Sequence, residues 1–140
     1  MESQAGTENE RLKHLEFIQA AISRLSNNSF LIRGWTVTAT GVFLVVSLQI
    51  GEWRVAVIAL FIGFGFWSLD SSYLRRERMF RRLYDDATLR NPPRIPLFTM
   101  NIQPYLPLVS WKSVFFSNSI LLIHLPIVAV DLGVAVLIAR

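Results

Sequence analysis

The chain has 140 residues, of which 52% are hydrophobic, and its mean hydropathy is +0.40. Ordinary soluble domains of this size are less apolar, so the composition favours a small membrane protein and leaves no room for both a membrane bundle and a full enzyme domain. The formal charge is +4, and the absence of cysteine excludes thiol catalysis, disulfides and cysteine metal sites.

Residues 1–28 are predicted to form a cytoplasmic amphipathic helix. The first ten residues are polar and net acidic, so a cleavable secretion signal is not expected. Apolar side chains then recur at 3-4-3 spacing, at Leu15, Ile18, Ile22 and Leu25. Such a face packs on the membrane surface, on its own chain, or on other copies in a helical bundle. The tetrad Ser-Asn-Asn-Ser at 26–29 favours N-caps and predicts a helix break.

Residues 29–74 are predicted to form a transmembrane hairpin. Its spans cover about 30–50 and 53–73, with a tight turn around Gly51 between them. Tyr73 and the segment after it, as far as residue 89, contain no glycine or proline. The second helix is therefore expected to continue past the membrane to Arg90, where Pro92 and Pro93 end it.

Residues 75–112 are predicted to form a basic cytoplasmic region, a helix followed by a proline-rich docked segment. The region holds eight of the fourteen Lys and Arg residues, and five of the six prolines lie between 91 and 111. Basic residues concentrate on the cytoplasmic side of multi-pass proteins. The amino terminus is therefore expected inside and the carboxyl terminus outside.

Residues 113–140 are predicted to form a third transmembrane helix, kinked at Pro126. Ser117, His124 and Asp131 follow one another at seven-residue steps and share one helical face. This stripe fits hydrogen bonding between helices, pore lining in a ring of copies, or a proton relay. It is not a catalytic triad, because neighbours lie roughly 10 Å apart along a helix.

Arg33 and Asp70 form the second candidate site. Arg33 lies 17 residues before Ile50, and Asp70 lies 17 residues after Trp53, so a hairpin brings them to the same depth. Their pairing would fix the register of the hairpin, since a single buried charge is costly. There are two alternatives. The residues could act in gating or in an ion vestibule, or each side chain could reach separately to the membrane interface.

A third candidate site is an arginine cluster that would bind anionic groups. Anionic lipid headgroups, or topology alone, account for most such clusters. A phosphate-bearing nucleotide or an oligonucleotide is the alternative, because aromatic residues between the arginines offer stacking surfaces. The cluster consists of Arg75, Arg78, Arg81 and Arg82, with Arg76 beside them.

The chain resembles a widespread family of small bacterial inner-membrane proteins. The resemblance covers most of residues 12–90, and it rests on His-Leu-Glu-Phe-Ile-Gln at 14–19, Arg24, Asn-Asn-Ser-Phe at 27–30, Gly-Trp at 34–35, Asp70, Tyr-Leu-Arg-Arg-Glu-Arg at 73–78 and Tyr-Asp at 84–85. Some members are similar to membrane effector subunits of antiphage operons, among them the channel component of the Hailong system. This resemblance implies a homo-oligomeric channel that a signal opens during infection.

Together these patterns predict an all-α, multi-pass protein of the bacterial inner membrane that forms a homo-oligomer, most simply a tetramer. The leading hypothesis is an oligomeric ion channel or membrane-permeabilising effector, gated from the cytoplasm and active in antiphage defence. The alternative is a membrane anchor or scaffold for a partner protein encoded beside it. No nucleophile–base pair or metal-ligand cluster is present in the sequence, so neither an enzyme nor a cofactor is expected.

Overall fold

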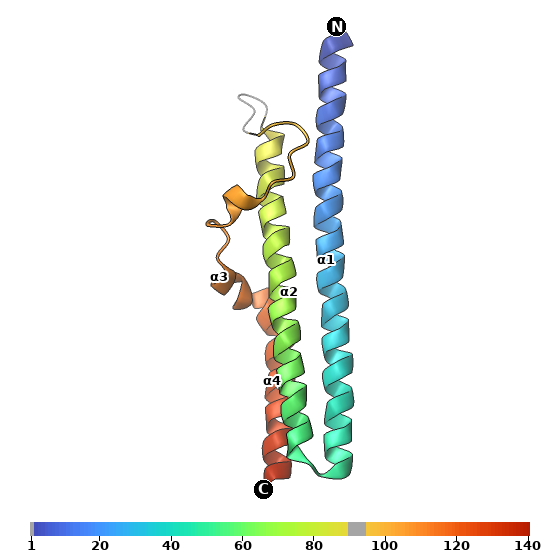
Figure 1. The fold of residues 1–140 in the computed structure, drawn as a ribbon, viewed down its shortest axis with the longest axis vertical. Coiled ribbons are helices and arrows are strands. Elements are labelled where there is room, and N and C mark those ends of the chain that lie inside the picture. The colour runs from blue at the N-terminus through green and yellow to red at the C-terminus, as the bar shows by residue number, and fades with distance from the viewer. Residues whose placement is uncertain (1, 90–94) are drawn as a thin grey trace.

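A computed structural model describes residues 2–89 and 95–140, with side chains from residue 6 onward in those ranges. Every regular element in these ranges is helical, which confirms the predicted all-α fold. In chain order (Figure 1), the elements are α1 (Glu2–Ile50), α2 (Trp53–Thr88), the 3₁₀ helix η1 (Gln103–Tyr105), α3 (Trp111–Phe115) and α4 (Asn118–Ala139).

The helices α1 and α2 form a long antiparallel hairpin, as the sequence predicts. Gly51 makes the turn with a φ of 65°, a backbone conformation that a side chain would strain. The Ser47 hydroxyl donates a hydrogen bond to the Glu52 carbonyl at 3.0 Å, and the Glu52 amide donates to the Ser47 carbonyl at 3.3 Å. These two bonds close the hairpin tightly, so the depths of residues on α1 and α2 are matched along its length.

The predicted helix break at residues 26–29 is wrong, because α1 continues through the tetrad without interruption. Ser26, Asn27 and Asn28 lie exposed on the helix surface, while Ser29 is buried against α2. Packing along the hairpin thus outweighs the local preference of these residues for a cap. One unbroken helix joins the amino-terminal region to the first span.

The amphipathic face of α1 packs on its own chain. Ile18 and Ile22 are buried in a core cluster with Met79 and Leu83 of α2. The hydrophobic contact that the 3-4-3 spacing indicated is therefore made within the hairpin. Leu15 is partly buried at the edge of the same cluster.

Beyond α2 the chain folds back onto the hairpin. The helix ends at Thr88, and the residues expected to end it, Arg90, Pro92 and Pro93, lie outside the described part of the chain. Tyr105 and Val109 of the proline-rich segment are buried in the same core cluster. This segment is docked, as its apolar side chains indicated.

The last span begins later than its predicted boundary at residue 113. The short helix α3 comes first, and Ser117 then stands at the N-cap of α4. From there α4 runs antiparallel to α2 and passes through Pro126 as one helix. It packs mainly against α2 and touches α1 less, so α2 is the central element of the bundle.

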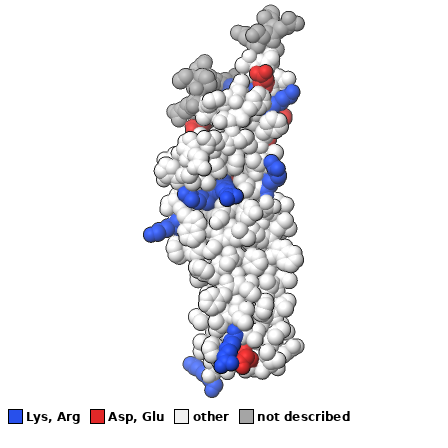
Figure 2. All heavy atoms as spheres, viewed as in Figure 1, with Lys and Arg blue, Asp and Glu red and all other residues white. Residues whose placement is uncertain are grey.

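Three helices, α1, α2 and α4, are long and apolar enough to cross a membrane, as a multi-pass membrane protein requires. Figure 2 shows charged side chains at the hairpin-turn end and above the middle of the molecule, with an uncharged band between them. The two chain termini lie at opposite ends (Figure 1). We call the end with the turn the turn side and the other the basic side.

Candidate functional site

Polar side chains line the inner surfaces of the three apolar helices. Four of them come from α1, two from α2 and two from α4, and all are buried: Ser29, Thr36, Thr40, Ser47, Asp70, Ser71, His124 and Asp131. The outward faces at the same levels carry large apolar side chains. The bundle is therefore apolar outside and polar inside, the reverse of a soluble helical bundle.

Several of these groups are satisfied by their own helix. Thr36 donates to the Ile32 carbonyl at 2.8 Å, and Thr40 donates to the Thr36 carbonyl at 2.7 Å. Hydroxyls that bond back to the preceding turn need no partner on another helix. Thr36 and Thr40 therefore add polar groups to the interior of the bundle, but their hydrogen bonds stay within α1.

Asp70 is the centre of the strongest polar cluster. Its Oδ1 accepts a hydrogen bond from the Ser29 hydroxyl, and its Oδ2 accepts one from Nε of Arg33 at 2.9 Å. Nε2 of His124 lies 3.1 Å from the same Oδ2. One fully buried carboxylate thus connects α1, α2 and α4.

The structure brings Arg33 and Asp70 together, as their equal distances from the turn suggested. The Arg33 side chain remains 24% exposed while Asp70 is fully enclosed. The guanidinium can therefore keep water or headgroup contacts on one side while it neutralises the buried carboxylate on the other. Such an arrangement lowers the cost of a charge inside an apolar bundle.

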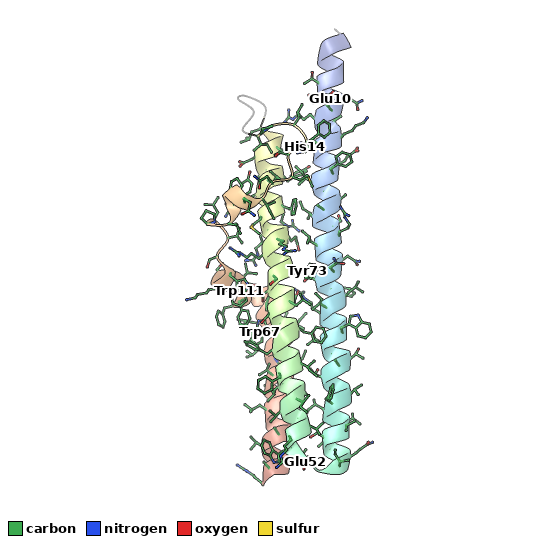
Figure 3. All side chains as sticks on the ribbon, in the orientation of Figure 1. Glu10, His14, Glu52, Trp67, Tyr73 and Trp111 are labelled. Carbon is green, nitrogen blue, oxygen red and sulfur yellow. The ribbon has the colours of Figure 1, made fainter. Side chains whose placement is uncertain are left out.

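His124 is held by an aromatic stack as well as by Asp70. Its imidazole lies nearly parallel to the Trp67 indole, with ring centroids 5.7 Å apart and an interplanar angle of 14°. The Trp67 indole also stacks on Phe115, with ring centroids 4.9 Å apart, and its Nε1 donates to the Phe115 carbonyl at 3.1 Å. The stack fixes the start of α4 against α2 at the level of Asp70. Figure 3 shows Trp67 on α2 near this junction.

Asp131 contrasts with Asp70 because neither of its oxygens has a partner among the described residues. The side chain is fully buried opposite Gly63 of α2. A Cβ atom on Gly63 would lie 3.8 Å from Oδ2 of Asp131 and 3.4 Å from Cγ2 of Thr40. Because Gly63 has no side chain, Thr40 of α1 and Asp131 of α4 approach α2 at the same level. The Asp131 carboxyl group lies where the three helices meet.

The predicted stripe of α4 is divided by the structure. Ser117 is half-buried at the N-cap, and its hydroxyl has no partner among the described residues. His124 joins Asp70, while Asp131 stands alone seven residues further along. His124 and Asp131 are enclosed by their own chain in this conformation, so neither side chain is exposed to line a pore.

The structure divides the predicted arginine cluster between two hollows, with Arg75 at one of them and the other three arginines at the second. Arg75 donates from Nε to the Val109 carbonyl at 2.8 Å and from Nη2 to the Leu106 carbonyl at 3.1 Å, so it holds the proline-rich segment. Arg81 pairs with Glu77 at 2.7 Å. Arg78, Arg81 and Arg82 line one hollow together with Asp85.

Sequence reasoning missed Ser29 and Trp67 as parts of the Asp70 cluster. Ser29 was assigned to a helix break, although it lies four residues before Arg33 and so shares its helical face. Trp67 joins the cluster through its stacking on His124. The register of α4 against α2 brings His124 to Asp70 and Trp67, and no sequence pattern predicts that register.

Within residues 2–89 and 95–140, no three His, Asp or Glu side chains are grouped closely enough to hold a metal ion. Comparisons with protein-family models, curated proteins and solved structures found no match to the chain.

Proposed function

We propose that the protein is an oligomeric ion channel or membrane-permeabilising effector of the bacterial inner membrane, gated from its basic side, which faces the cytoplasm. The observation that supports this proposal is the buried Asp131 carboxyl group, which has no partner among the described residues. Ionisable groups within spanning helices are costly, and proteins retain them chiefly where ions, protons or ligands pass.

The proposal treats the described conformation as closed. His124, Asp131, Thr36 and Thr40 are enclosed by α1, α2 and α4 of one chain, so none of these four side chains faces outward. Conduction requires these helices to separate and to turn their polar faces toward a shared pore. A closed ring of copies, most simply a tetramer, would provide that pore, with the exposed apolar faces against lipid and neighbouring copies.

The role in antiphage defence is proposed from the resemblance to membrane effectors of antiphage operons. A closed channel that opens on a signal would depolarise an infected cell. The continuous helices α1 and α2 connect the basic side to the polar interior, and they are the elements that would carry such a signal.

The test is conductance of the purified full chain in planar bilayers, with wild type compared to Asp70→Asn. Asparagine removes the charge that draws Arg33 and His124 to α2, so the closed packing should loosen and basal conductance should rise. Ser72→Ala is the matched control, since the Ser72 hydroxyl bonds only to the Ser68 carbonyl of its own helix. Absence of current in wild type and Asp70→Asn, with both still oligomeric, would reject the channel.

A membrane anchor or scaffold is the second candidate, and exposed apolar side chains on the basic side favour it. Leu12 and Phe17 of α1 are 53% and 55% exposed, and Leu97 and Phe98 are 43% and 47% exposed beside them. Apolar side chains grouped beyond the membrane are typical of protein contacts. In this case Leu12→Ser and Phe17→Ser should abolish partner or self-association and leave membranes impermeable in every variant.

A further inference from the structure

A cleft of about 680 Å³ opens on the basic side between α1, α2 and the proline-rich segment. Arg24 and Asn28 of α1 line one wall, and Arg76 of α2 lines another. Gln103 and Trp111 complete the lining from the segment that folds back. Residues distant in sequence thus form one concave surface.

The cleft is strongly positive. Arg24, Arg75 and Arg76 all line it, and none of its lining residues is acidic. Arg75 is already held by two carbonyl groups, whereas Arg24 and Arg76 make no hydrogen bond or ion pair within the described part of the chain. Two guanidinium groups are therefore available to an anion, and guanidinium groups bind phosphate oxygens in a paired geometry.

The position of the cleft corresponds to the headgroup layer of a membrane. Asn28 lies five residues from Arg33, and Ser72 lies two residues from Asp70. The near end of the cleft is thus roughly 3 to 8 Å beyond the Arg33–Asp70 pair, at 1.5 Å per helical residue. Headgroups occupy a layer of about 5 to 8 Å on each side of the hydrocarbon core. Figure 3 shows Trp111 beside α2, close to the level of Tyr73.

The remaining walls are apolar. Leu25, Phe80 and Leu106 line the cleft between the arginines, and the Trp111 ring is 39% exposed at its membrane end. Apolar walls suit a glycerol backbone and the start of acyl chains better than a fully hydrated ion. Tryptophan at this depth is typical of the boundary between headgroups and hydrocarbon.

We propose that this cleft binds the phosphate headgroup of an anionic phospholipid, with Arg24 and Arg76 as the phosphate ligands. The Asn28 and Gln103 side chains offer amide donors to the remaining headgroup oxygens. Lipid binding at this cleft requires that the protein lie in a membrane, but it does not require conduction. The lipid site and the channel are therefore tested separately.

The test titrates the full chain in detergent with short-chain phosphatidylglycerol or phosphatidylcholine and follows binding by native mass spectrometry. Wild type should prefer phosphatidylglycerol. Arg24→Gln with Arg76→Gln should weaken its binding by about tenfold or more, since both phosphate contacts are lost. Each single variant should lose less affinity for phosphatidylglycerol than the double variant. If the double variant does not fold, the affinity of Arg24→Gln alone provides the test.

Arg78→Gln with Arg82→Gln is the matched control. It also removes two positive charges from the basic side, but at the separate hollow that Arg78 and Arg82 line. It should weaken binding by no more than about twofold. Equal loss in both double variants would show general attraction and overturn the cleft. Excess inorganic phosphate should leave the bound lipid in place, and its displacement would assign the cleft to a soluble phosphate compound instead.

Discussion

His124 of α4 contacts Asp70 of α2 through Nε2 and Oδ2 at 3.1 Å, although 54 positions separate the two residues in the chain. Both side chains are almost completely enclosed. The contact joins the last span to the hairpin at the level where Arg33 and Ser29 also reach Asp70. Asp70 therefore affects the packing of all three spanning helices.

Replacing Asp70 should destabilise the bundle more than replacing Arg33. Asp70→Ala leaves Arg33, Ser29 and His124 without their shared acceptor, whereas Arg33→Ala leaves Asp70 two of its three bonds. Removing one member of a buried pair costs about 3 to 5 kcal/mol, and the exposed edge of Arg33 should reduce that figure. Thermal unfolding in detergent measures both, and the double variant should recover part of the loss. Strictly additive losses would contradict coupling between the two residues.

Gly63 and Gly65 provide a matched pair of substitutions. Gly63→Leu should lower stability by about 1 to 3 kcal/mol, because its side chain would enter the contact with Thr40 and Asp131. Gly65→Leu should change stability little, since no atom lies within 4 Å of a Cβ atom there and the position is exposed. Melting temperatures of the two variants in the same detergent make the comparison. Equal losses would mean that the close approach at Gly63 is not specific.

Asp131→Asn should make the protein more stable and the channel less active. A carboxyl group at the centre of a span costs roughly 2.5 to 3.5 kcal/mol on insertion scales, and no described residue offsets that cost. The amide avoids the charge, and it also removes the negative group that would attract cations. Melting temperature and bilayer conductance should therefore change in opposite directions. Leu132→Ala, at an exposed neighbouring position, is the control for both measurements.

Arg75→Gln should release the proline-rich segment from α2. The guanidinium makes two hydrogen bonds to carbonyls of that segment, and glutamine is too short to replace both. Chymotrypsin should then cut after Leu97, Phe98 or Tyr105 several times faster than in wild type. Arg78→Gln should leave the cleavage rate unchanged. Equal protection of wild type and Arg75→Gln would show that burial of Tyr105 and Val109 is sufficient to hold the segment.

The absence of cysteine allows a direct test of topology. A cysteine at exposed Gln19 should be shielded from a membrane-impermeant maleimide in spheroplasts, and a cysteine in place of Arg140 should react. This outcome follows from the excess of basic residues on the side of Gln19. Labelling of both positions from outside would contradict an odd number of spans.

The sequence predicted the hairpin and the Arg33–Asp70 contact because a two-residue turn fixes depth along both helices. It could not predict the contact of His124 with Asp70, since α4 follows an irregular segment whose length does not determine a register. The sequence also did not predict the cleft that Arg24 lines, because the path of the irregular proline-rich segment over α1 and α2 cannot be read from its residues. The error at residues 26–29 had another cause. The local preference of these residues for a helix cap is weaker than the packing of Ile22 and Ser29 on α2, and the sequence pattern does not show that packing.

The unbroken course of α1 has a mechanical consequence. At 1.5 Å per residue, 49 residues make a helix about 74 Å long, with Thr36 and Thr40 in its second half. A rod without a hinge turns and tilts as one body. A force applied at its amino-terminal end would therefore reach the distant contact at Gly63, and in the proposed channel a displacement of a few ångströms there would admit water to Asp131.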